Sequence, residues 1–138
     1  MIEFKEVKRQ RDEALAKLGR PTTQELRDVE AVVTTRPVPQ LDGSTRKEYA
    51  LTNELAMVVL RTNREIDDPD LDESGTNRSI HAVNPAPFAR DMADGIWGTC
   101  LDPITINYYE DEALPPELIN GQTRCYAFLM SEIGGKLA

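Results

Sequence analysis

The sequence contains little histidine, cysteine or tryptophan, and this scarcity limits the chemistry that it offers. Its 138 residues include one His, two Cys and one Trp, and aromatic residues make up 6% of the chain. Cys100 and Cys125 are 25 positions apart, form no CxxC motif, and have only His81 beside them as a typical zinc ligand. Disulfide frameworks and zinc sites use more cysteines or histidines at closer spacing. We therefore predict two reduced cysteines that pack as small apolar side chains, and no metal site.

Long apolar segments are also absent. The longest uninterrupted apolar run, Leu55–Leu60, has six residues, whereas a membrane-spanning helix needs about 18 or more. The first residues alternate charged and apolar side chains and lack the apolar centre of a signal peptide. These features predict a protein that does not enter a membrane and is not secreted by a signal peptide. The expected location is the cytoplasm, or a particle such as a virion that is assembled there.

Positive charge is scarce in the later parts of the chain. The net charge is −8, to which residues 1–40 contribute +1, residues 41–80 contribute −4 and residues 81–138 contribute −5. Nucleic-acid binding gains most of its affinity from Lys and Arg contacts to phosphates. An acidic protein of this kind is therefore not expected to bind nucleic acid directly.

The chain has the length of one ordinary domain. We predict an α+β fold in which residues 1–21 form an N-terminal helical arm and residues 22–138 form a single domain with a mostly antiparallel sheet and short helices. Apolar residues at spacings of three and four predict the helix of the arm over Glu3–Leu18, and Gly19 and Pro21 end it. They form a narrow stripe that Arg11 interrupts, which consists of Phe4, Val7, Ala14, Leu15 and Leu18.

Local signals predict a hairpin in the first half of the domain. Thr22 and Glu25 have the spacing of a capping box, which predicts a second helix that reaches Val33. Arg36–Pro39 must be extended, because its two prolines restrict the backbone. Asp42-Gly43 is typical of a tight turn, so we expect the flanking residues 38–41 and 47–51 to pair as a hairpin.

The second half of the chain gives weaker signals. Leu55–Ile66 fits either a buried helix or a strand, and we favour the strand. The other expected elements are a polar loop over Asp67–Ser79, a short helix over Phe88–Asp94, a strand over Pro103–Tyr109, a helical turn over Pro115–Ile119 and a buried element over Arg124–Ile133.

One acidic segment partly matches a calcium-binding loop. Asp68, Asp70 and Asp72 occupy the first, third and fifth positions of such a loop. The glycine and glutamate required at positions six and twelve are replaced by Glu73 and Ser79. The segment is therefore predicted to be a solvated acidic loop, with a looser calcium or magnesium site as the alternative.

Catalytic patterns are incomplete. Cys100 and His81 have the residue types of a nucleophile and a base, but neither lies in a sequence typical of a thiol enzyme. The carboxylates of residues 110–112 follow a predicted strand, where a charge run is usually a solvated turn. No glycine-rich phosphate loop opens a helix. We therefore predict no catalytic residue and no cofactor.

The remaining features are typical of a protein that makes contacts with other proteins. An isolated helix with a narrow apolar stripe needs a partner surface. Arg36–Pro39 is suited to lie along another surface. Trp97 has glycines close on both sides and is expected to anchor the core, with an interface anchor as the alternative. Our hypothesis is a non-enzymatic assembly subunit that forms a homo-oligomer or larger particle, such as a head, neck or tail protein of a bacterial virus. Its predicted interface residues are Phe4, Val7, Leu15, Leu18, Pro37, Val38 and Trp97.

Two alternatives belong to other classes of protein. The first is an acidic inhibitor or binding protein that mimics nucleic acid, in which residues 67–73 and 110–112 gather on one face. The second is a small cysteine-dependent enzyme that uses Cys100.

Overall fold

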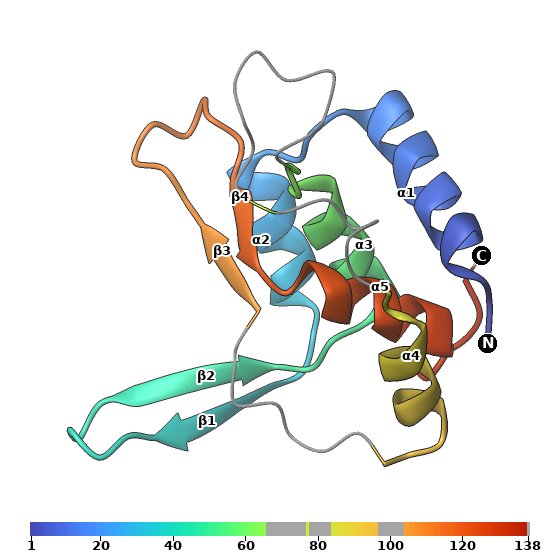
Figure 1. The fold of residues 1–138 in the computed structure, drawn as a ribbon. Helices are drawn as coiled ribbons and strands as arrows, with labels where there is room; N and C mark the ends of the chain where they lie inside the picture. Colours follow the sequence, from blue (N-terminus) through green and yellow to red (C-terminus); the bar gives the residue numbers. More distant parts are fainter. Residues whose placement is uncertain (66–76, 78–83, 97–103, 138) are drawn as a thin grey trace.

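The computed structural model describes residues 1–65, 77, 84–96 and 104–137, with only the backbone at Arg46 and Lys47. Within these residues it contains five helices and two separate two-stranded antiparallel sheets, so the predicted α+β class is confirmed (Figure 1). In chain order the elements are α1 (Phe4–Leu18), α2 (Thr23–Ala31), β1 (Thr35–Pro39), β2 (Thr45–Tyr49), α3 (Asn53–Arg61), α4 (Ala86–Ala93), β3 (Thr105–Asn107), β4 (Glu117–Asn120) and α5 (Gln122–Ser131).

The core is built around α5, which packs against α1, α3 and α4 (Figure 1). All residues from Cys125 to Ser131 are buried, as a helix enclosed by other helices on several sides requires. Phe4 of α1 meets the Tyr126 ring edge to face, with 5.1 Å between the ring centres. The buried element predicted over Arg124–Ile133 is thus the central helix of the fold.

Two arginines join α1 to α3. Arg11, which interrupts the apolar stripe of α1, is buried and donates from Nε to the carbonyl of Leu60 at 3.0 Å and from Nη2 to that of Asn63 at 2.9 Å. Arg61 of α3 donates in the opposite direction, to the carbonyl of Gly19 at 3.1 and 2.8 Å. Each arginine therefore satisfies carbonyls at or just beyond the end of the other helix. The helix of the predicted arm, residues 1–21, is held on the body by these contacts.

The predicted capping box at the start of α2 forms only in part. The hydroxyl of Thr22 accepts a hydrogen bond from the amide of Glu25 at 3.1 Å, as expected. The carboxylate of Glu25 instead accepts a hydrogen bond from Nη1 of the buried Arg61 at 2.7 Å. A buried guanidinium needs a charged partner more than an exposed amide does, so the tertiary contact replaces the local one.

The strand favoured over Leu55–Ile66 is wrong, because residues 55–61 belong to the helix α3; Ile66 lies outside the described residues. Thr52 caps the helix by accepting a hydrogen bond from the amide of Leu55 at 3.1 Å. The buried apolar residues recur with helical spacing on the face toward α5: Leu55, Ala56, Val59 and Leu60.

The helical turn predicted over Pro115–Ile119 is also wrong, because Glu117–Asn120 forms β4. This strand pairs antiparallel with β3, and Leu118, which is fully buried, lies opposite Ile106. Of the strand predicted over Pro103–Tyr109, only Thr105–Asn107 forms a strand, β3, among the described residues. Both segments are strands because they pair with each other, and the local sequence of neither segment indicates this partner.

Candidate assembly surface

The hairpin β1–β2 follows from local turn chemistry, as predicted. Gln40 and Ser44 close the ladder through a 2.8 Å bond from the amide of Gln40, and Gly43 takes a left-handed φ of +87°. The carboxylate of Asp42 accepts hydrogen bonds from the amide and hydroxyl of Ser44 at 2.9 and 2.6 Å. A three-residue loop with glycine in the left-handed position is a common hairpin connection.

The hairpin extends away from the helices, and each of its strands packs mainly on the other (Figure 1). Leu41 at its tip is fully exposed, at 110% of the reference area, and Tyr49 at its base is 46% exposed. A two-stranded hairpin alone is marginally stable in water. Contact with another surface would supply the stabilisation that the isolated hairpin lacks.

The hydrogen-bonded ladder fixes which backbone groups of the hairpin point outward. The amide of Ala50 donates to the carbonyl of Thr34 at 2.8 Å, and the corresponding bond joins Gln40 and Ser44. Because bonded pairs alternate with non-bonded pairs, the pairs 36/48 and 38/46 also face inward. The backbone groups of residues 35, 37 and 39 in β1, and of 45, 47 and 49 in β2, therefore point to the outer edges.

The two outer edges differ in their capacity to bind a further strand. In β1 the outward positions 37 and 39 are prolines, which have no amide hydrogen to donate. In β2 the outward positions are Thr45, Lys47 and Tyr49, which all keep their amide hydrogens. No described strand pairs with β2 other than β1. The prolines thus close the edge of β1 to strand addition, whereas the edge of β2 is open with respect to the part of the chain that the structure describes.

The two faces of the hairpin also differ. Residues opposite one another in an antiparallel pair point to the same face. On one face Arg36 and Glu48 form an ion pair at 2.5 Å beside the half-buried Val38. The other face carries a group of exposed residues that are apolar or β-branched: Thr35, Pro37, Pro39, Thr45 and Tyr49.

The predicted interface residues fall into three groups. Val7 is fully buried and Phe4 partly buried in the core of their own chain, so Val7 offers no exposed side chain to a neighbour. Leu15 is half-buried and Leu18 is 61% exposed at the end of α1, far along the sequence from the hairpin. Pro37 and Val38 lie in β1, and Trp97 lies outside the described residues.

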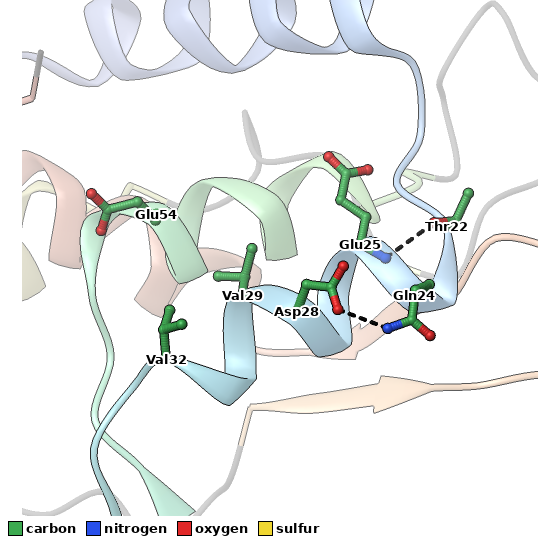
Figure 2. Close-up of a pocket in the computed structure, with 7 residues that line it drawn as sticks. All are labelled: Thr22, Gln24, Glu25, Asp28, Val29, Val32 and Glu54. Atoms are coloured by element: carbon green, nitrogen blue, oxygen red, sulfur yellow. Dashed lines mark hydrogen bonds between the residues drawn. The ribbon is translucent and has the colours of Figure 1, made fainter.

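An open depression of about 490 Å³ lies beside α2 and the start of α3. Figure 2 shows that its acidic side chains come from both helices: Glu25 and Asp28 from α2, and Glu54 from α3. Arg61 donates to Glu25, and Gln24 donates to Asp28 at 2.7 Å. The lining contains no histidine or cysteine, so it offers neither a thiol nucleophile nor an imidazole base. It does not compete with the hairpin as a candidate site.

The two tyrosines before the acidic turn at residues 110–112 have structural partners. Tyr108 donates to Glu30 at 3.1 Å and lies under the guanidinium of Arg27, 5.4 Å from the ring centre. Burial, followed by the charge of Glu30, raises the pKa of Tyr108, so its hydroxyl stays protonated as a donor. Tyr109 donates at 2.9 Å to Glu117, a buried residue of β4.

Several predicted chemical groups lie outside the described residues. These are the acidic loop with Asp68, Asp70 and Asp72, and the pair formed by His81 and Cys100. Within the part of the chain that is described, no cluster of three or more His, Cys, Asp or Glu residues is placed to hold a metal ion. No helix there is long and apolar enough to cross a membrane.

Cys125 is expected to resist thiol reagents in the folded protein. It is a free thiol with no exposed surface, and burial raises its pKa to about 12. Because the thiolate is the reactive form, we expect no reaction with a chromogenic disulfide reagent at pH 8 in a Cys100→Ser variant. One thiol per chain should appear after denaturation. Rapid reaction of the native variant would contradict the buried position of Cys125.

Comparison of the chain with protein-family models, with curated proteins and with solved structures finds no match.

Proposed function

We propose that this protein is a non-enzymatic assembly subunit whose hairpin β1–β2 makes subunit contacts within a larger particle. The observation that supports this most directly is the projecting hairpin, which has one edge closed by prolines and one edge open. Prolines on an edge strand limit strand addition there, so the hairpin can add a strand at the edge of β2 but not at the edge of β1.

The charge distribution favours the hairpin over the body as the surface through which copies of this chain meet. Residues 35–49 contain three Lys or Arg and two Asp or Glu, a net charge of +1, whereas the whole chain carries −8. The residues outside the hairpin therefore carry −9. Copies of this chain repel one another through their bodies and repel least through their hairpins, so an assembly contact at the hairpin has the lowest electrostatic cost.

Truncation of the hairpin tests this function. Replacing residues 37–47 by Asn-Gly would join Arg36 to Glu48, an inward-facing pair, through a two-residue turn. We expect the wild-type chain, 15.5 kDa per copy, to form oligomers. The truncated chain, which is shorter by nine residues, should have the mass of a single copy in light scattering behind size exclusion. The body should keep its stability to within about 1 kcal/mol, because the removed residues are mainly exposed.

Two outcomes would contradict the proposal. An oligomer that survives truncation would show that other surfaces hold the copies together. A wild-type chain that stays monomeric at all concentrations but binds basic proteins in a salt-sensitive manner would favour the acidic inhibitor instead.

A further inference from the structure

We propose that β2 of one copy pairs antiparallel with β2 of a second copy across a two-fold axis at Lys47, and that the two hairpins form one four-stranded sheet. This inference rests on the proposed function, because it names the partner of the assembly surface. The order of strands in the joined sheet would be β1, β2, β2 of the second copy and β1 of the second copy.

The first reason is that, among the described residues, no further strand pairs with β2 and every outward position of β2 keeps its amide hydrogen. Its outward positions Thr45, Lys47 and Tyr49 present both amide hydrogens and carbonyls, as antiparallel pairing requires. The outer edge of β1 lacks donors at Pro37 and Pro39. When two copies join through β2, both outer edges of the new sheet belong to β1 and are closed. The assembly step therefore ends at two hairpins and does not continue as a fibre.

The second reason is that the sequence of β2 is complementary to itself in this register. Outward-facing residues must lie opposite outward-facing residues, and centring on Lys47 places Thr45 opposite Tyr49 of the second copy. The same register places Arg46 opposite Glu48 of the second copy, and the symmetry repeats this pair of opposite charges. Registers centred on Arg46 or Glu48 would instead place two arginines or two glutamates opposite each other at the axis.

The third reason is the marginal stability of a hairpin alone. Three or more strands with an apolar face are needed for a sheet that is stable independently. Joining two hairpins creates four strands and doubles the exposed face described above, with its prolines, threonines and Tyr49. The pairing therefore supplies the strand partner that each hairpin lacks among the described residues.

Lys47 opposes the pairing, and two substitutions at this position are expected to change the fraction of dimer in opposite directions. Two copies of Lys47 meet at the axis, and like charges directly opposite are unfavourable. Lys47→Thr removes this repulsion and keeps the amide hydrogen, so we expect a larger fraction of dimer at a given concentration. Lys47→Pro also removes the repulsion but removes the central outward amide, so we expect the dimer to be lost.

Thr35→Pro is the matched control for Lys47→Pro. Residue 35 also faces outward, but on the β1 edge, where two neighbouring prolines are already accommodated. We expect Thr35→Pro to keep a mass of twice 15.5 kDa and Lys47→Pro to fall to one copy. Equal loss of the dimer in both variants would mean that proline damages the hairpin itself. Cross-linking would then test whether β2 pairs with β2 of a second copy.

Cross-linking reads the register directly and needs no proline. In a Cys100→Ser background, Lys47→Cys places two thiols opposite each other, about 5.5 Å apart between Cα atoms in a bonded pair, a distance that a disulfide spans. Thr45→Cys is the control, because its two copies would be about 14 Å apart in the same register. We expect mild oxidation to yield a covalent dimer for Lys47→Cys and none for Thr45→Cys.

The outcomes separate this inference from the function on which it rests. If hairpin truncation dissociates the oligomer but Lys47→Cys forms no cross-link, the hairpin binds by its tip or faces and the β2 pairing is wrong. If truncation leaves the oligomer intact, the proposed function is wrong as well. Efficient cross-linking of Thr45→Cys in place of Lys47→Cys would overturn the register.

Discussion

Replacing Arg11 by methionine is expected to lower the free energy of unfolding by about 3 kcal/mol, since it removes the charged hydrogen bonds that the guanidinium donates to the carbonyls of two buried residues. Arg11 is 5% exposed and donates to the carbonyls of Leu60 and Asn63, which are themselves buried residues at the end of α3. Methionine retains much of the apolar stem, so the loss reflects mainly the hydrogen bonds. Urea denaturation followed by circular dichroism measures the change.

Arg9 provides the control for Arg11 on the same helix. It forms ion pairs with Glu6 at 2.7 Å and Glu13 at 2.6 Å, and its side chain is 57% exposed. Exposed pairs of this kind contribute between about 0 and 1 kcal/mol, so Arg9→Met should have a small effect. Equal losses in the two variants would show that the contacts of Arg11 with α3 do not hold α1 on the body.

Gly121→Ala is expected to destabilise the protein by about 3 kcal/mol, through backbone strain and a steric clash together. Gly121 joins β4 to α5 with a φ of +117°. A Cβ atom at this position would lie 2.8 Å from Cγ1 of Ile104 and 3.1 Å from two further atoms of that side chain. The central helix and the β3–β4 sheet would have to move apart, which thermal and urea denaturation would detect.

Gly95→Ala separates the two contributions. Gly95 has a φ of +74° after α4, and a Cβ atom there would meet nothing within 4 Å. Only the left-handed backbone then opposes alanine, at a cost of about 1 kcal/mol. If Gly121→Ala costs no more than Gly95→Ala, the close approach of Ile104 does not constrain the junction.

The candidate assembly surface was more predictable from the sequence than the core was. Asp42-Gly43 specifies the turn of the hairpin through its own side chain and backbone, and the bounds of α1 and α4 follow from the nearby glycines and prolines. The presence of Pro37 and Pro39 in an extended segment was also evident. The sequence did not show that these prolines remove amide donors from the outer edge of β1, because a register shifted by one residue would turn the two positions inward.

The sequence by itself determined the elements whose signals lie within a few residues: the hairpin, the first helix and the short helix α4. Tertiary structure decided α3 and β4, because α5 and β3 supply the buried partners that select helix in one case and strand in the other. It also decided the role of Arg11, which breaks an apolar pattern in the sequence but binds carbonyls that lie 49 and 52 residues further along the chain. A local pattern cannot reveal such a partner, since the desolvation that makes the contact necessary exists only after the helices have packed.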